Sequence, residues 1–327
     1  MCEVHVTMVA DSSRHARVDT ECHSRHAVNM TWTAQDISDQ TDRTFLVTGA
    51  NSGLGYVTAL ELARHHGHVI MVVRNEAKGR EALASIGAAV PGASLQLLVA
   101  DMADLDSVKR LAAGLRDHTI DVLVNNAGIM MPPRSLSPQG HESQFATNHL
   151  GHFALTGLLL DQITDRIVTV SSDLHRSGSI HWDDLTGAKK YSPAGFYSQS
   201  KFANVLFGLE LDRRLRAAGS AVRSIITHPG YAATNLQTTG PTGMMKVLGR
   251  ITNRVFAQPV QKGAWSQLYA AVSPEALSGQ YIGPKGRSGF PTVQDPVAAA
   301  TSPESAKRLW ELSEDLTSVH YHLPVTA

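Results

Sequence analysis

Short apolar runs that alternate with helical patterns are the feature of this sequence that most restricts its fold. Each run has the length and composition of a strand buried on both faces. The runs lie at 44–48, 68–73, 94–99, 120–125, 166–171 and 221–227. Helical patterns separate them at 53–66, 75–89, 104–117, 141–164 and 195–217. Strand–helix alternation with right-handed crossovers predicts an α/β fold, a doubly wound parallel sheet with helices on both faces.

The part of the chain after the sixth run is less regular. Residues 231–258 are rich in Gly, Pro, Thr and Asn, which predicts a loop with short helices that serves as a substrate lid. A helix is expected at 261–272 and a last strand at 280–283. Ser302 followed by Pro303 predicts the capped start of a final helix.

One domain is predicted over residues 41–318, with a short tail at 319–327, because no second boundary is visible. Residues 1–40 stand apart, since they are polar and show no sustained periodicity. Two explanations stay open for them. They form a disordered extension, or translation begins at Met30 and the preceding residues are not made.

Composition excludes several classes of partner and location. The chain has 29 Lys plus Arg and 29 Asp plus Glu, so bulk charge does not favour nucleic acid or a membrane surface. No apolar run approaches the ~18 residues of a membrane span. The two cysteines, Cys2 and Cys22, both precede the predicted domain, so a reducing, cytoplasmic location is expected.

A glycine-rich turn follows the first predicted strand directly. Gly49, Gly53 and Gly55 stand in TGANSGLG, where the strand passes into the first helix. Residues without a Cβ allow a tight turn and the close approach of a diphosphate, and the helix start offers free amide groups. The turn therefore predicts a nucleotide-binding site.

The end of the second strand indicates which dinucleotide is bound. NAD-binding proteins usually carry an acid there for the ribose hydroxyls, whereas an Arg suits a 2′-phosphate. This chain has Arg74 at that place, and Glu76 is better explained as a first-turn helix residue. NADP(H) is the predicted coenzyme, with NAD as the alternative.

Tyr197 and Lys201 lie one helical turn apart in GFYSQSKFANVLF, so their side chains share one face of a helix. The same helix carries an apolar stripe at Phe202, Val205, Leu206 and Leu209. Two interpretations are open. The Tyr ring packs under the aliphatic part of the Lys side chain, or the ammonium lowers the pKa of a catalytic phenol.

These pieces together resemble the classical short-chain dehydrogenases/reductases over residues 41–318. The matching motifs are TGANSGLG, NNAG, NHLGHF, RIVTVSS, YSQSK and HPG, in that order, with an Ala-Asp pair after the third strand. NHLGHFALT and RLWELSEDLT are similar to the retinol-dehydrogenase-like branch. The resemblance implies a Rossmann fold.

The resemblance also implies a set of coenzyme-binding residues. Asp101 would meet the adenine, the NNAG strand end would line the coenzyme, and the HPG turn would meet the nicotinamide. The full set is Gly49, Asn51, Ser52, Gly53, Leu54, Gly55, Arg74, Asp101, Met102, Asn125, Ala127, Gly128, Tyr197, Lys201, Pro229, Gly230 and Thr234.

Four residues are the catalytic candidates that the resemblance implies: Asn148, Ser172, Tyr197 and Lys201. Tyr197 would be the acid in reduction and the base in oxidation, with its pKa lowered by Lys201 from the usual ~10. Ser172 would hydrogen-bond the substrate oxygen, with Ser171 as the alternative. Asn148 would anchor a water that passes protons from Lys201.

We therefore expect an NADP(H)-dependent oxidoreductase that interconverts an alcohol and a carbonyl of a lipophilic small molecule. A catalytically idle nucleotide-binding protein is the alternative from another class. The segment 173–195 is expected to form a wall of the substrate pocket, with Trp182 and Tyr191 either lining it or packing the loop. No metal site is expected, and the helices at 141–164 and 195–217 are where a homo-oligomer would pair.

Overall fold

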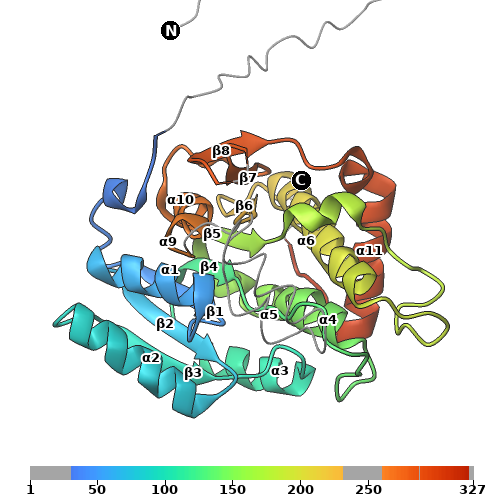
Figure 1. The fold of residues 1–327 in the computed structure, drawn as a ribbon, viewed down its shortest axis with the longest axis horizontal. Coiled ribbons are helices and arrows are strands. Elements are labelled where there is room, and N and C mark those ends of the chain that lie inside the picture. The colour runs from blue at the N-terminus through green and yellow to red at the C-terminus, as the bar shows by residue number, and fades with distance from the viewer. Residues whose placement is uncertain (1–30, 231–259, 287, 324–327) are drawn as a thin grey trace, which may run out of the picture.

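A computed structural model describes residues 31–230, 260–286 and 288–323 of the chain (Figure 1). Their strands form one eight-stranded sheet in the order β3-β2-β1-β4-β5-β6-β7-β8. The strands are β1 Thr44–Thr48, β2 His68–Val73, β3 Leu95–Val99, β4 Ile120–Asn125, β5 Ile163–Val170, β6 Arg223–Thr227, β7 Tyr281–Pro284 and β8 Pro291–Gln294. All neighbours pair in parallel except β7 and β8. The predicted α/β fold with a doubly wound parallel sheet is confirmed.

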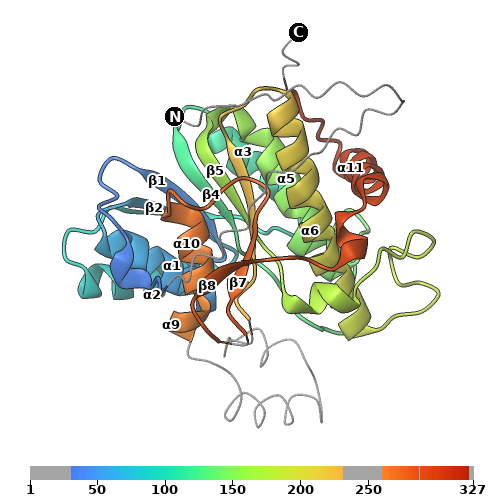
Figure 2. The same ribbon diagram turned by 90° about the horizontal axis from the view of Figure 1, so that it is seen from above.

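Helices cover both faces of the sheet (Figure 2). On one face lie α1 Gly53–Arg64, α2 Glu76–Ala89, α9 Val260–Gly263 and α10 Trp265–Val272. On the other lie α3 Leu105–Gly114, α5 Gly151–Leu158, α6 Pro193–Ala217 and α11 Pro303–Thr317. The central strands are buried on both faces, which explains why they appear in the sequence as continuous apolar runs. In the described residues no helix is long and apolar enough to cross a bilayer.

The helix predicted at 141–164 is broken into several pieces. It comprises the short helix α4 Ser143–Phe145, a π turn at Ala146–Leu150, α5, and a 3₁₀ turn at Leu160–Gln162. Gly151, at the junction of the π turn and α5, lies so close to the backbone of Met102 that a Cβ there would collide with the Met102 carbonyl. The break therefore brings this segment against the loop after β3.

The folded body extends beyond both predicted domain ends. Before residue 41, Ile37 is buried in the core and the Gln40 amide donates to the His65 carbonyl at 2.7 Å. After residue 318, the Tyr321 hydroxyl donates to the Phe153 carbonyl at 2.7 Å. Isolated apolar residues in short segments give no periodic signal, which is why the sequence did not show these contacts. The same reason applies to the unpredicted β8, which has only four residues.

Helix α11 covers part of the surface where pairing with a second chain was expected. Its Trp310 is buried, and its ring lies 5.2 Å from Phe153 in α5 and 5.9 Å from Phe207 in α6. Arg214 of α6 lies over the same indole at 4.3 Å. The chain thus covers much of this α5–α6 surface with its own C-terminal helix, and a homo-oligomer stays a prediction.

A charged cluster joins the amino-terminal ends of the central strands. Asp165 of β5 pairs with Arg43 at 2.5 Å, with Arg166 at 2.9 Å, and with Arg223 of β6. The buried Arg166 also donates to the carbonyls of Ala270 and Ser273, at the end of α10. Burial raises the pKa of Asp165, but hydrogen bonds and charge from Arg223 and Arg166 outweigh it and lower that pKa below its usual value.

We predict that Asp165→Asn lowers the free energy of unfolding by about 2–4 kcal/mol at pH 7, because three guanidinium groups lose their shared carboxylate. Asp165 has a lowered pKa in the folded protein, so its contribution is present above the unfolded value of ~4 and is lost as the pH falls below it. Urea unfolding of wild type, Asp165→Asn and the exposed control Asp161→Asn measures this. A gap between wild type and Asp165→Asn that stays constant down to pH 3 would contradict the account.

Candidate active site

The predicted site residues follow the carboxyl ends of neighbouring parallel strands. The glycine turn follows β1, Arg74 follows β2, and Ser172 follows β5 by two residues. Because carboxyl ends of parallel strands meet at one edge, the fold gathers these segments there. The strand order changes direction between β1 and β4, which is where α/β sheets bind ligands.

The glycines of the turn are required by close packing. Gly49 and Gly53 have φ angles of +69° and +57°, which favour glycine. A Cβ on Gly49 would lie 2.9 Å from the Cα of Ala127, and one on Gly55 would collide with the Gly49 carbonyl. The turn is therefore pressed between α1 and the end of β4.

The start of α1 is suited to bind an anion. Its N-cap residue, Ser52, makes no side-chain capping bond, and no acidic residue stands in the first turn. Asn51, Ser52 and Leu54 are partly exposed. Free first-turn amides without a competing carboxylate fit the diphosphate of a dinucleotide.

Arg74 is exposed and has no hydrogen bond or ion pair within the described residues. Its neighbour Asn75 caps α2 by accepting from the Lys78 amide at 3.0 Å. Glu76 is the first residue of α2, as predicted, and pairs with Arg80 at 2.5 Å. The cation at the end of β2 is therefore available, whereas the nearest acid is occupied.

Asp101 and Met102 occupy the loop after β3. The Asp101 carboxylate accepts from the Ala103 amide at 2.9 Å, and its backbone amide donates to Ser107 Oγ at 3.0 Å. Met102 is buried and its backbone lies against Gly151. The loop is thus held in a fixed conformation at the sheet edge where adenine contact was expected.

The NNAG segment is bonded to β1 through residues that the sequence did not indicate. Thr48 Oγ1 accepts from the amides of Asn126 and Ala127, both at 2.9 Å, and the Asn126 side chain donates to the Thr48 carbonyl at 2.7 Å. Asn125 is buried and its amide donates to Thr156 of α5 at 2.9 Å. The side chain of Asn125 therefore joins β4 to α5, whereas Gly128 lies beside Asn148 and Lys201.

Tyr197 and Lys201 are both buried in α6, with exposed fractions of 5% and 3%. Lys201 Nζ lies 5.8 Å from the centre of the Tyr197 ring and donates to the Val170 carbonyl at 3.1 Å. The same carbonyl accepts from Asn204 at 3.0 Å. The two residues therefore share a helix face that is bonded to the last residue of β5.

The two neighbouring serines have different environments. Ser171 is buried, and its hydroxyl donates to the Lys201 carbonyl at 2.8 Å. Ser172 is partly exposed, and its Oγ accepts from the Leu174 amide at 3.3 Å. Ser171 thus fixes α6 to β5, whereas Ser172 is the serine whose side chain lowers the pKa of Tyr197.

The pKa of Tyr197 differs from the sequence-based expectation. Burial raises it to about 12, and the hydrogen bond from Ser172 opposes this only in part. Burial also lowers the pKa of Lys201 to about 8. In the chain without coenzyme, loss of hydration is therefore the largest influence on both pKa values.

Asn148 stands in the π turn and is held on several sides. Its Oδ1 accepts from the Ile129 amide at 2.8 Å, and its Nδ2 donates to the Ile129 carbonyl at 3.0 Å and to Ser200 Oγ at 2.9 Å. A Cβ on Gly128 would lie 3.2 Å from Asn148 Oδ1 and 3.7 Å from Lys201 Nζ. These three residues are therefore adjacent.

His152 is a buried residue beside the site that sequence reasoning missed. Its Nε2 lies 2.9 Å from Thr48 Oγ1 and its Nδ1 lies 3.2 Å from the Asn148 carbonyl. Burial lowers its pKa to about 4, so the ring is neutral at physiological pH. The residue joins β1 to the π turn. The one signal in the sequence that could have identified His152 was its position in the NHLGHF motif.

Trp182 and Tyr191 of the segment 173–195 pack within the protein. The Tyr191 hydroxyl donates to the Pro132 carbonyl at 3.0 Å, and Arg308 of α11 lies 4.1 Å from the Trp182 ring.

At the HPG turn, Gly230 has φ +66° and its amide donates to His228 Nδ1 at 3.3 Å. Thr234 and the predicted lid at 231–258 lie outside the described residues.

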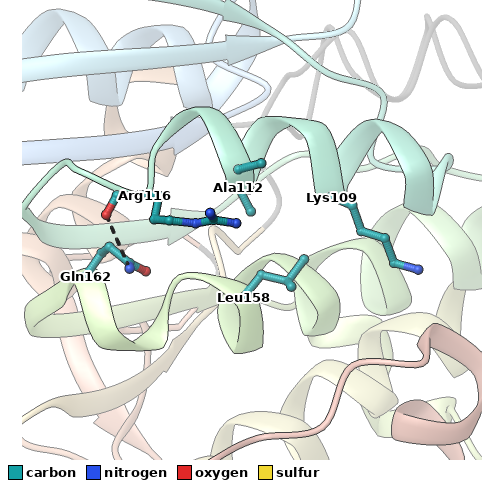
Figure 3. Close-up of a pocket in the computed structure, with 6 residues that line it drawn as sticks. Lys109, Ala112, Arg116, Leu158 and Gln162 are labelled. Atoms are coloured by element: carbon teal, nitrogen blue, oxygen red, sulfur yellow. Dashed lines mark hydrogen bonds between the residues drawn. The ribbon is translucent and has the colours of Figure 1, made fainter.

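A shallow depression of about 260 Å³ lies between α3 and α5 (Figure 3). It is lined by Lys109, Ala112, Ala113, Arg116, Leu158 and Gln162. Gln162 immediately precedes β5, so the depression lies toward the amino-terminal ends of the strands. None of the predicted catalytic or coenzyme residues lines it, and it is not part of this site.

Comparison with known sequences identifies the family. The sequence profile described as short chain dehydrogenase matches residues 43–243. Mouse retinol dehydrogenase 14 is 37% identical over 297 residues, covering 85% of this chain and 86% of the relative. Human retinol dehydrogenase 13 is 38% identical and covers 85% of each chain. Human polyprenol dehydrogenase is 37% identical and covers 74% of this chain and 76% of its own.

Solved structures give the same result. A crystal structure of an uncharacterised protein from Mycobacterium paratuberculosis matches with a TM-score of 0.77 and 42% identity, covering 90% of this chain and all of that one. A structure described as an NAD(P)-dependent gluconate 5-dehydrogenase from Beutenbergia cavernae, with bound NADP, matches with a TM-score of 0.59 and 26% identity over 75% of this chain and 96% of its own. This chain belongs to the short-chain dehydrogenase family of oxidoreductases, in its retinol-dehydrogenase-like branch.

Proposed function

We propose that this chain is an NADP(H)-dependent oxidoreductase that interconverts an alcohol and a carbonyl compound of lipophilic character. The observation that carries the proposal is the placement of Tyr197 and Lys201 on one buried face of α6, with Lys201 Nζ 5.8 Å from the Tyr197 ring and bonded to the Val170 carbonyl, at the same strand end as Ser172. In a catalytically idle protein, a buried ammonium there would only lower stability. The intact group therefore favours an enzyme.

The chemistry assigned to these residues is acid–base catalysis of hydride transfer. A bound nicotinamide would supply or accept the hydride. Tyr197 donates its phenolic proton to the substrate oxygen in reduction and accepts it in oxidation. Ser172 Oγ donates a hydrogen bond to the oxygen on which charge develops. Lys201 holds the nicotinamide ribose, and Asn148 anchors a water that passes protons from Lys201.

Residues along the sheet edge would hold the coenzyme. The amides at the start of α1 fit its diphosphate, and the guanidinium of Arg74, which has no partner in the part of the chain that the structure describes, fits a 2′-phosphate. Asp101 would meet the adenine and Pro229–Gly230 the nicotinamide. NAD remains the alternative coenzyme, and the solved relative from Beutenbergia cavernae that is described with bound NADP is consistent with the proposal.

Apolar side chains near the catalytic group favour a lipophilic substrate. Ile129, Met130 and Met131 directly follow Gly128 and are partly exposed, and Leu174, two residues after Ser172, is 41% exposed. The names of the retinol and polyprenol dehydrogenases that resemble this chain denote lipophilic alcohols. A cytoplasmic location stays a prediction that rests on the positions of the cysteines.

We predict that Tyr197→Phe lowers kcat by about 10²- to 10⁴-fold, because the reaction loses its proton donor. The Kd for NADPH should stay within about twofold of wild type, since the ring and its packing remain. A panel of aliphatic and aromatic aldehydes and ketones, followed by NADPH and NADH absorbance, identifies a working substrate. Tyr56→Phe, which removes a hydroxyl bonded to Ser85 on α2, is the matched control. Turnover that persists in Tyr197→Phe would defeat the mechanism.

We predict that Arg74→Asp lowers the ratio of kcat/KM for NADPH over NADH by roughly 10- to 100-fold, the value of one lost charge-assisted hydrogen bond. The control is Arg80→Asp, which makes the same charge reversal nearby, in the second turn of α2, at a residue paired with Glu76. An equal shift in both variants would show a general field effect and would refute a 2′-phosphate contact at Arg74.

A further inference from the structure

Three buried rings stand side by side near Ser172, and the proposed reaction uses none of them. His175 follows Ser172 in a 3₁₀ turn at Asp173–Ser177, Tyr281 begins β7, and His228 follows β6. The centre of the Tyr281 ring lies 5.1 Å from the His175 ring and 5.1 Å from the His228 ring. Their exposed fractions are 0%, 1% and 3%.

The hydrogen bonds of His175 fix its protonation state. Its Nδ1 lies 2.8 Å from the Ser172 carbonyl, which can only accept, and 3.1 Å from the Tyr281 hydroxyl, which can accept from the same N–H. Its Nε2 lies 3.1 Å from the Val297 amide, which can only donate. The proton is therefore on Nδ1 and the ring is neutral. Burial lowers the pKa of His175, in agreement with this tautomer.

The Ser172 carbonyl is thereby held by two donors from one residue. The His175 backbone amide donates to it at 3.0 Å, in addition to Nδ1 at 2.8 Å. Fixing this carbonyl fixes the ψ angle of Ser172, which is 154°, and so orients the residue within the turn. The direction of its Cβ, and with it the position of Oγ, depends on that orientation.

We propose that His175 is a positioning residue for Ser172, whose side chain it orients at the carboxyl end of β5 by holding the Ser172 carbonyl. The inference rests on the proposed function and adds a residue to it. The competing explanation is a purely structural one, in which His175 serves only to fix the Val297 backbone through Nε2. The two explanations assign the role to different ring nitrogens.

Two substitutions separate the ring nitrogens. The amide nitrogen of Asn stands as many bonds from Cα as Nδ1, so His175→Asn keeps a donor for the Ser172 carbonyl and loses the Val297 contact. The amide group of Gln reaches the place of Nε2, so His175→Gln keeps an acceptor for Val297 and loses both Nδ1 contacts, with the Ser172 carbonyl and with the Tyr281 hydroxyl. We expect kcat to fall about tenfold in His175→Gln and to be restored to within about threefold of wild type in His175→Asn.

A double-mutant cycle shows whether His175 acts through Ser172. In a Ser172→Ala background the hydroxyl to be positioned is missing, so His175→Gln should cause no further loss of kcat. The Kd for NADPH should be unchanged in every variant, and thermal unfolding checks that each is folded. His68→Gln, at the distant start of β2, is the matched control.

The results that overturn the proposal are specific. A loss of kcat in His175→Asn as large as that in His175→Gln would overturn it, and so would an equal loss from His175→Gln with and without Ser172. If His175→Gln does not fold, the kcat of His175→Asn alone decides. A kcat within about threefold of wild type supports the proposal, and a larger loss overturns it. Failure of the proposed function is a separate result, since it would appear as turnover in Tyr197→Phe with wild-type His175.

Discussion

The attachment of α6 to the end of β5 is the interaction on which the site depends. The Val170 carbonyl accepts from Lys201 and from Asn204, and Ser171 donates back to the Lys201 carbonyl. Three hydrogen bonds thus join one turn of the helix to the last residues of a central strand. Because β5 is paired with β4 and β6, this attachment sets the place of Tyr197 relative to the NNAG and HPG segments. The position of Tyr197 is therefore set by the sheet and not by the loops.

This attachment carries a cost in stability. The folded protein lowers the pKa of Lys201 to about 8, whereas the unfolded chain has the ordinary value of ~10.5. The folded state therefore binds this proton less tightly, and the cost is fully present below pH 8 and disappears as the pH rises past ~10.5. The raised pKa of Tyr197 adds a cost only above pH ~10, where the phenol of the unfolded chain ionises and the buried phenol does not. Such a cost is typical of catalytic sites, where stability is exchanged for function.

Much of the fold and part of the site were predictable from the sequence. Strands buried on both faces appear as apolar runs, and a helix face pairs residues four apart, so the sheet and the proximity of Tyr197 to Lys201 followed directly. Contacts between distant segments leave no local pattern, which is why the role of Thr48 was missed. The raised pKa of Tyr197 was missed because sequence shows a neighbouring charge but not the depth of burial.

The central claim is that the proton affinity of Tyr197 is set by the positive charge beside it, once the coenzyme is bound. Ultraviolet titration of tyrosinate, taken as the difference between wild type and Tyr197→Phe, measures this pKa with and without NADP⁺. The account predicts a pKa near 12 in the free protein and at least two units lower in the complex, with the decrease reduced in Lys201→Met. A pKa that stays near 12 with NADP⁺ bound would contradict it.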